Sequence, residues 1–462
     1  MRKTILLAAI IGTSALSSAA FARPMTETDL AIMKRLSGAT ASPDGTMIAY
    51  QLRETDLAAN KGKTDLYMLK IGANPQPMMF ASKPDKNEHD PAFAPDGKSI
   101  FYISNESGSD QIWRYDIATA TTTQASNFKA DVSGFKISPD GQKFAVWGDI
   151  ARDCMEFGCE TDGDTSKPGP GTGREYDQLM IRHWDQWETP GNYSRVFTFM
   201  LGADGKLGTS GTAMDGTLVG DAPSKPFGGG DEISWNADSS GIVFTLRLAD
   251  KNEAKSTNLD IYGASLKSKA SVNLTADNAG TDTTPAMSPD GKWMAWTSMP
   301  RATYEADRLV VKLMDVKSGK VTALTEKWDR SVASLAWALD SRSLLATAQD
   351  VLETPLYRVD LKGKVTRLTD RGSIAEAVPL KNGGVVYAIN SISGPSDLVH
   401  MDAKGKTTRL TNVNADALAT LDPVNYQKFD FAGANGERVF GQIVKPQNAT
   451  GKLPVLLLVH GG

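Results

Sequence analysis

The stretch AMSPDGKWMAWT, residues 286–297, decides the fold, because variants of it recur along most of the chain. Pro289 fixes φ at the first position of a tight turn, and Asp290 and Gly291 accept the tight or left-handed geometry that follows. The β-branched and aromatic residues after the turn favour an extended strand. The stretch therefore predicts one arm of a β-hairpin.

Seven copies of this turn, some of them degenerate, can be marked by their aspartate or asparagine: Asp44, Asp96, Asp140, Asp238, Asp290, Asp340 and Asn382. Successive marks lie 42 to 52 residues apart, except for one interval of 98 residues. A repeat of this length built from strands is typical of a β-propeller. Seven marks predict seven blades.

Each unit has enough strands for a four-stranded blade. Most units carry a third strand, as at residues 112–116, 259–262 and 355–360. Four units close on a Leu-Thr pair: Leu274-Thr275, Leu324-Thr325, Leu368-Thr369 and Leu410-Thr411. A lone blade cannot bury both of its faces, whereas a closed ring of blades can. We therefore predict a mainly β chain whose propeller occupies residues 23–411.

The composition of the chain argues against one class of binding partner, nucleic acid. The chain has 462 residues, 40% of them hydrophobic, and a formal net charge of −4. This is enough apolar material for a large core, and no basic run is present that would follow a phosphate backbone. We expect no nucleic-acid partner. A homodimer remains an open alternative to a monomer.

The first 22 residues have the pattern of a secretory signal peptide. Arg2 and Lys3 supply the positive end, a short apolar centre follows, and Ala20-Phe21-Ala22 is a small-x-small cleavage site. The apolar centre is too short to span a bilayer well, and no later apolar run approaches about 20 residues. We predict cleavage after Ala22 and a periplasmic or secreted protein that does not enter the membrane.

Cys154 and Cys159 are the chain's two cysteines. In an exported protein, a disulfide across this short loop is favoured. A metal site is the weaker alternative, because no second Cys or His pair lies near them in the sequence. We predict a disulfide, no metal site and no cofactor.

The 98-residue interval contains an insertion at about residues 148–193, which we interpret as an enlargement of one blade. It holds a Gly/Pro-rich stretch at residues 167–173 and then the cluster RHWDQW at residues 182–187. Two interpretations of the cluster stay open. Its tryptophans pack the insertion onto the ring, with Arg182 paired to Asp185, or the cluster forms a lip over a substrate chamber.

Different material begins after Thr411. Residues 426–431 and 439–446 read as two strands joined by the turn Asn435-Gly436. The apolar run at residues 453–459 predicts a buried, parallel strand, and it is followed by His460-Gly461-Gly462. We therefore expect residues 412–462 to be the first part of an α/β-hydrolase domain, whose strand needs helices that the given sequence does not supply.

A buried strand ending in His-Gly-Gly, a two-stranded prelude and a Ser-Pro-Asp-Gly propeller together resemble the prolyl oligopeptidase superfamily of serine peptidases. Within it the chain looks most like the acylaminoacyl-peptidase and dipeptidyl aminopeptidase branch, and specifically the dipeptidyl peptidase 5 type. The resemblance extends from about Met25 to Gly462 but takes in only the front edge of the catalytic domain.

The resemblance implies a propeller that gates access to a hydrolase domain acting by acyl transfer from a serine. In the family, the second glycine of His-Gly-Gly donates its backbone N–H to the oxyanion, which assigns this role to Gly462. The nucleophile's Gly-x-Ser-x-Gly motif is absent from the given sequence, and none of the four histidines stands where a triad histidine would: His89, His183, His400 and His460. We predict that this chain alone is inactive.

The resemblance also implies an exopeptidase that takes short peptides, and the amino terminus of such a substrate needs carboxylates. The acidic side chains of the insertion are the candidates: Glu175, Asp177, Asp185 and Glu188. For each of them an ordinary solvated or paired surface charge is the alternative. For the chain as a whole, the alternatives are a non-catalytic periplasmic binding propeller and an inactive truncated relic.

Overall fold

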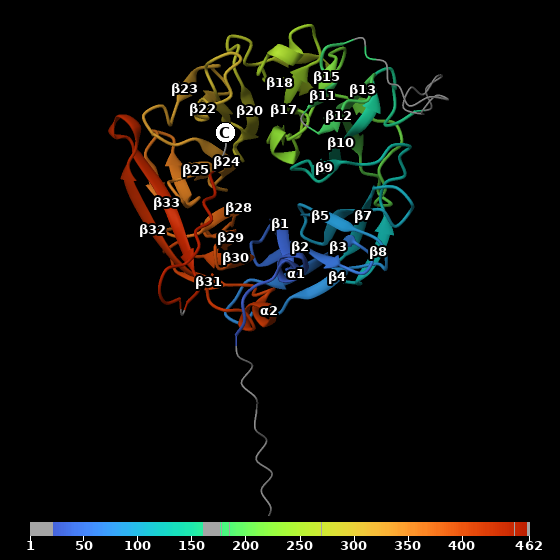
Figure 1. Cartoon of the computed structure of the whole chain (residues 1–462). Helices are drawn as coiled ribbons and strands as arrows, with labels where there is room; N and C mark the ends of the chain where they lie inside the picture. Colours follow the sequence, from blue (N-terminus) through green and yellow to red (C-terminus); the bar gives the residue numbers. More distant parts are fainter. Residues whose placement is uncertain are drawn as a thin grey trace, which may run out of the picture.

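The protein forms a ring of seven antiparallel sheets around a central channel (Figure 1). The computed structural model describes residues 22–159, 176, 178–183, 185–268, 270–447 and 449–459. The predicted seven-bladed propeller is confirmed. The proposed signal peptide lies outside the described residues, apart from Ala22.

The first three blades are built from consecutive segments of the chain. Their strands are β1 (Arg35–Ala41), β2 (Met47–Asp56), β3 (Lys61–Lys70) and β4 (Met78–Ala81); β5 (Glu88–Phe93), β6 (Ser99–Ser104), β7 (Gln111–Asp116) and β8 (Thr121–Gln124); and β9 (Gly134–Ile137), β10 (Lys143–Ala151), β13 (Asn192–Met200) and β14 (Thr212–Ala213).

The fourth blade has a fifth, short strand, and the last three blades are regular. The strands are β15 (Gly220–Asp221), β16 (Ile233–Trp235), β17 (Gly241–Leu248), β18 (Asp260–Ser265) and β19 (Ser271–Asn273); β20 (Asp282–Met287), β21 (Trp293–Ser298), β22 (Val310–Asp315) and β23 (Val321–Ala323); β24 (Val332–Trp337), β25 (Ser343–Ala348), β26 (Leu356–Asp360) and β27 (Val365–Arg367); and β28 (Ser373–Pro379), β29 (Val385–Ser391), β30 (Gly394–Met401) and β31 (Thr407–Arg409).

Short elements flank the ring. They are the helices α1 (Glu27–Ile32) and α2 (Ala415–Ala419), the 3-10 turns η1 (Gly230–Glu232), η2 (Glu253–Lys255) and η3 (Ala434–Gly436), and the hairpins β11 (Arg182–His183) with β12 (Gln186–Trp187) and β32 (Asn425–Ala432) with β33 (Arg438–Lys445). The long interval in the repeat is one blade, because β10 pairs directly with β13 in the register Ala151↔Asn192.

The repeated turn is held by its serine. The Ser138 hydroxyl donates to an Asp140 carboxylate oxygen at 2.5 Å and accepts the Lys143 N–H at 3.0 Å. Gly141 follows at φ +71°, a conformation that side chains with a Cβ rarely adopt. Ser42 and Ser288 make the same pair of hydrogen bonds in their blades. The motif is therefore a local hydrogen-bonded unit that starts the second strand of a blade.

The Leu-Thr endings also have a physical role. The hydroxyl of Thr275 accepts the N–H of Ile261, and the hydroxyl of Thr411 accepts that of Leu398. Thr325 and Thr369 do the same in the fifth and sixth blades. Each threonine thus satisfies a buried backbone donor on β18, β22, β26 or β30.

The core lies between neighbouring blades. Phe101 of β6 packs edge-on against Phe144 of β10, with ring centroids 4.9 Å apart. Trp337 of β24 packs in a cluster with Ala295 of β21 and donates its indole N–H to the Ala286 carbonyl at 2.9 Å. Because every face is covered by the next sheet, the strands read apolar on both sides.

The ring closes without exchanging a strand between the first and last blades in the part of the chain described. Leu36 and Tyr50 of the first blade pack with Val386 and Leu398 of the last. The Glu376 carboxylate, on β28, also accepts the N–H groups of Gly38 and Ala39 on β1, both at 2.9 Å. Asn414 adds two further bonds, one to the N–H and one to the carbonyl of Lys34, each at 2.9 Å.

The C-terminal material differs from expectation in one respect. The hairpin β32–β33 forms across the predicted turn, with Asn435 at φ +57°. The apolar run at residues 453–459 is not a strand here, and residues 455–459 are 78–90% exposed. The predicted buried strand does not form here: within the described residues neither strands nor helices pack against this run, and a parallel strand needs both.

We predict that Glu376→Ala lowers the free energy of unfolding by about 1–2 kcal/mol, because two N–H groups at the blade junction lose their acceptor. The measurement is the denaturant midpoint of the variant against that of Glu305→Ala, a control at an exposed position. Equal midpoints for the two variants would contradict a role for Glu376 in closing the ring.

Candidate functional site

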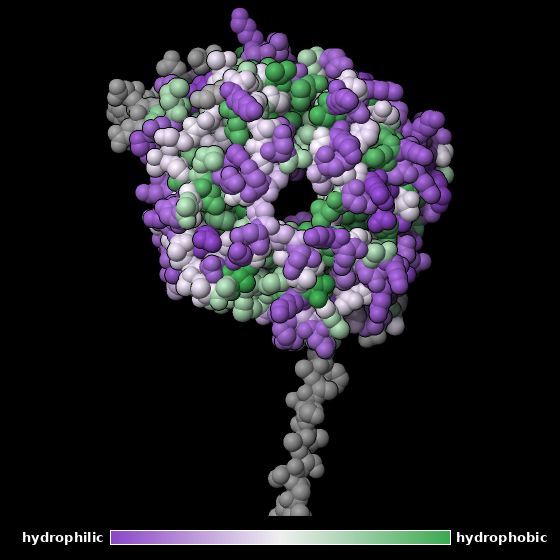
Figure 2. Space-filling model, turned by 180° about the vertical axis from the view of Figure 1, so that it is seen from behind, coloured by the Kyte–Doolittle hydropathy of each residue, from purple (hydrophilic) through white to green (hydrophobic). Residues whose placement is uncertain are grey.

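The channel side of the first four blades carries a cavity of about 970 Å³. Its walls come from the inner strands β1, β5, β9 and β16, and from residues 223–230 of the fourth blade. The central opening of the ring is visible in Figure 2, where polar and apolar side chains alternate around its rim. A space of this size fits a short peptide.

Residues 222–230 form a loop against this cavity that is anchored by a buried carboxyl group. Glu232 accepts the Ser224 N–H at 2.6 Å, the Ser224 hydroxyl at 2.8 Å and the Thr283 hydroxyl at 2.7 Å. A Cβ on Gly228 would lie 2.3 Å from a Glu232 carboxylate oxygen, so glycine is required there. Burial raises the pKa of Glu232 to about 7, in opposition to these hydrogen bonds.

The base of the insertion is held by a buried ion pair, that of Arg195 with Asp215. Arg195, 2% exposed, forms a two-pronged pair with Asp215, with contacts of 2.7 and 3.1 Å. The same guanidinium donates to the Cys154 carbonyl at 2.8 Å. Cys154 and Cys159 are joined in a disulfide with a Cα–Cα distance of 5.6 Å, as predicted. Arg195 therefore ties the disulfide loop to the wall of the third blade.

Charged side chains gather where the insertion meets the cavity. The Lys225 ammonium lies 3.1 Å from Asp149 and 3.4 Å from Asp221. Burial raises the pKa of Asp221 to about 6, and the charge of Glu188 adds to this rise. Burial likewise raises the pKa of Glu253 to about 7, against the attraction of Arg247. Of these groups, Asp149 and Lys225 line the cavity itself, and Glu253 lines a separate pocket.

The structure separates the candidate acidic residues. Asp185 is exposed at the tip of the β11–β12 hairpin. Glu188 is half-buried, and its charge acts on Asp221, Lys225 and Glu253, so it belongs to the charged cluster beside the cavity. Glu175, Asp177 and Gly462 lie outside the described residues.

The packing interpretation of the RHWDQW cluster does not hold for Trp187. That side chain is 54% exposed, and the Arg182 guanidinium lies 5.3 Å from its ring centre rather than in a pair with Asp185. His183 instead contacts Phe227 of the cavity loop, with ring centroids 5.8 Å apart. Trp184 lies outside the described residues. The hairpin thus rests on the loop that borders the cavity.

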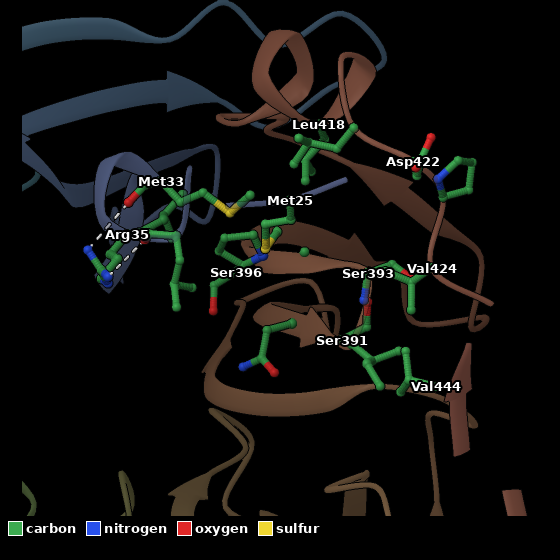
Figure 3. A pocket seen from close by; sticks show the side chains of 18 residues that line it. Met25, Met33, Arg35, Ser391, Ser393, Ser396, Leu418, Asp422, Val424 and Val444 are labelled. Carbon is green, nitrogen blue, oxygen red and sulfur yellow. Dashed lines mark hydrogen bonds between the residues drawn. The ribbon is translucent and has the colours of Figure 1, made fainter. Parts of the chain in front are cut away.

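A second cavity, of about 840 Å³, lies between residues 25–36, the last blade and the segment that follows it (Figure 3). Met25, Met33 and Leu418 line one part of it, and Val424 and Val444 of the C-terminal segment line another. The side chains that line this cavity are mostly apolar, as expected of a packing surface and not of a reaction centre.

Among the described residues, no group of three or more His, Cys, Asp or Glu side chains is arranged to hold a metal ion. None of the described helices has the length and apolarity that crossing a bilayer requires.

Comparison with known proteins gives the family. The chain is 30% identical to dipeptidyl-peptidase 5 of Porphyromonas gingivalis over 99% of its own length and 67% of that protein. It is 29% identical to the protein of the same name from Porphyromonas endodontalis, of which it covers 62%. The chain belongs to the dipeptidyl-peptidase 5 family. No family model matches it.

Solved structures show the same fold as this dipeptidyl-peptidase 5 relative. The acylaminoacyl peptidase of Pyrococcus horikoshii matches 90% of the chain with a TM-score of 0.67 and 17% identity, over 58% of its own length. The β-propeller domain of the trilobed protease from Pyrococcus furiosus, described as having an open velcro topology, matches 83% of the chain and 97% of its own length, with a TM-score of 0.55 and 16% identity. These two likenesses show that the propeller fold is shared.

Sequence reasoning missed the groups that shape the cavity of this family member. Glu232, Lys225 and Lys136 stand in ordinary blade sequence and carry no motif. The one available signal was the glycine run at residues 228–230 beside acidic residues, which indicates a close backbone approach.

We predict that Glu232→Gln removes part of the pH dependence of stability. Burial holds the pKa of Glu232 above its ordinary value of 4.5, at about 7. Its stabilising contribution is therefore complete below about pH 4.5 and is lost as the pH rises through about 7. From pH 5 to 8 the wild type should lose about 1–3 kcal/mol relative to the variant, whose amide can still bond Ser224 and Thr283.

The measurement is denaturant unfolding of both proteins at several pH values. Asp221 and Glu253 also have raised pKa values, so the difference between the two curves is the informative quantity. Parallel curves would show that Glu232 does not titrate in this range.

Proposed function

We propose that this chain is the propeller part of an exported serine exopeptidase that releases dipeptides or single residues from short peptides. The observation that carries the proposal is the dipeptidyl-peptidase 5 relative, which matches along 99% of the chain. The channel cavity supports it, because about 970 Å³ suits a short peptide and is far too small for a folded protein. The signal-like residues 1–22 support export.

The proposed serine mechanism requires a hydrolase domain, and the C-terminal segment offers the surface on which such a domain would pack. The chain spans 62–67% of the length of the relatives from Porphyromonas. Phe431, Val444 and residues 455–459 are more than half exposed, and the apolar cavity of Figure 3 lies next to Val444. Apolar surface of this extent is typical of an interface. We propose that a hydrolase domain covers it, with Gly462 donating its N–H to the oxyanion.

The amino terminus of the peptide is proposed to bind in the channel cavity beside Asp149. The Lys225 ammonium lies beside Asp149 and Asp221 there, and the charge of Glu188 also acts on it. An excess of carboxyl groups over cations favours a second ammonium, which a peptide amino terminus supplies. Asp185 is the weaker candidate, because its tip position leaves it in solvent.

The intact mass of the native protein, labelled with a fluorophosphonate serine probe, tests the proposed function. A labelled species larger than 49.5 kDa by roughly 200 residues or more would support it. An unlabelled species of this chain's own mass would overturn it in favour of a binding propeller.

We predict that Glu188→Gln, in the unlabelled native-length protein, raises KM about tenfold for peptides with a free amino terminus. It should leave KM unchanged for the N-acetylated forms of the same peptides. Asp185→Asn, at the tip of the adjoining β11–β12 hairpin, is the matched control and should change neither. An equal effect of Glu188→Gln on free and acetylated peptides would rule out amino-terminus binding by this residue.

A further inference from the structure

Four charged residues line the channel cavity: Asp90, Lys136, Asp149 and Lys225. Three of them have a partner side chain. Asp149 and Lys225 pair with each other at 3.1 Å, and Asp90 lies 3.1 Å from His89. The fourth is Lys136, on the inner strand β9. No ion pair of Lys136 occurs within the described ranges, and Asp231 is the one charge that acts on it appreciably.

The Lys136 side chain is fixed in place rather than free to seek solvent. Its ammonium donates to the Ile233 carbonyl at 2.5 Å, across the boundary between the third and fourth blades. Trp235 donates its indole N–H to the Lys136 carbonyl at 3.0 Å, which holds the backbone of the same residue. An ammonium has three N–H donors, so this bond to a neutral carbonyl uses one of them.

Burial of this cation has an energetic cost that its surroundings do not offset. Burial lowers the pKa of Lys136 to about 8, and the attraction of Asp231 opposes this shift. A bound anion would restore the missing charge balance. Trp147 and Trp235 line the same cavity and offer apolar faces beside the cation.

We propose that Lys136 is the anchor of a carboxylate-binding subsite in the channel cavity, which takes the C-terminal carboxylate of a short peptide. This rests on the proposed function, because a peptide must enter the cavity. Asp149 and Lys136 both line the cavity, so the cavity offers a carboxylate and a cation that has no ion pair within the described residues. A short zwitterionic peptide has the matching charge distribution.

The test compares binding of the tripeptide Ala-Ala-Phe with that of its C-terminal amide, by calorimetry at pH 7. Protein pretreated with a fluorophosphonate is used, so that hydrolysis cannot deplete the ligand. The free acid should bind about tenfold more tightly than the amide. In Lys136→Met this ratio should fall to about one, while Lys136→Arg should retain most of it.

Lys225→Met is the matched control, since Lys225 lines the same cavity but already pairs with Asp149 and Asp221. It should keep the preference for the acid. The wild-type ratio should also fall between pH 7 and 9, as Lys136 loses its proton. Equal binding of acid and amide by the wild type, or an unchanged ratio in Lys136→Met, would overturn the proposal.

Two further comparisons are needed. One distinguishes a C-terminal carboxylate from a side-chain carboxylate, and the other distinguishes failure of the subsite from failure of the proposed peptidase function. If Ala-Asp-Phe amide binds as tightly as Ala-Ala-Phe acid, a side-chain carboxylate occupies the subsite and the C-terminal assignment is wrong. If the acid binds through Lys136 but the native-length protein hydrolyses no peptide, the subsite stands and the proposed function fails. If hydrolysis occurs and Lys136→Met leaves the ratio unchanged, the subsite alone fails.

Discussion

The contact between the first and last blades is the constraint on which the rest of the ring depends. A blade has two apolar faces, and six of the seven junctions join sheets that follow each other along the chain. The seventh must bring together β1 and β28, more than 300 residues apart, without a shared strand. Glu376 meets this requirement by binding two adjacent N–H groups of β1, the first of them at Gly38, whose φ of +65° presents both donors to one carboxylate.

The channel cavity follows from this closure. Its walls are the inner strands of four successive blades, so the positions of Lys136, Trp235 and Asp149 depend on the angle between sheets rather than on any one turn. Glu232 joins the fourth blade to the fifth through Thr283 and holds the cavity loop through Ser224. The same carboxyl group therefore fixes both a blade junction and the wall of the proposed binding site.

The repeated turn motif made the fold predictable from the sequence. The residues of the site belong to no such motif, so the site was not predictable. Ser138, Asp140 and Gly141 act within one turn, so a local pattern reveals them. The apolar run at 453–459 misled because a strand needs partners that no local pattern supplies. The contacts of Lys136 and Asp149 are with residues far away in the sequence, Ile233 and Lys225 respectively. Among the insertion's acids, the sequence could not separate Glu188 from Asp185, because burial beside Lys225 distinguishes them and spacing does not.

Two lysines in one cavity show how the same residue type can have different roles. Lys225 lies between Asp149 and Asp221, so its charge is balanced and its contribution is to hold the loop against the third blade. Lys136 donates to the neutral carbonyl of Ile233 and makes no ion pair within the described ranges, so its charge is available to a ligand in the cavity. Retaining a buried cation without a carboxylate costs stability. Such a cost is typical of binding sites, where the ligand supplies the missing charge.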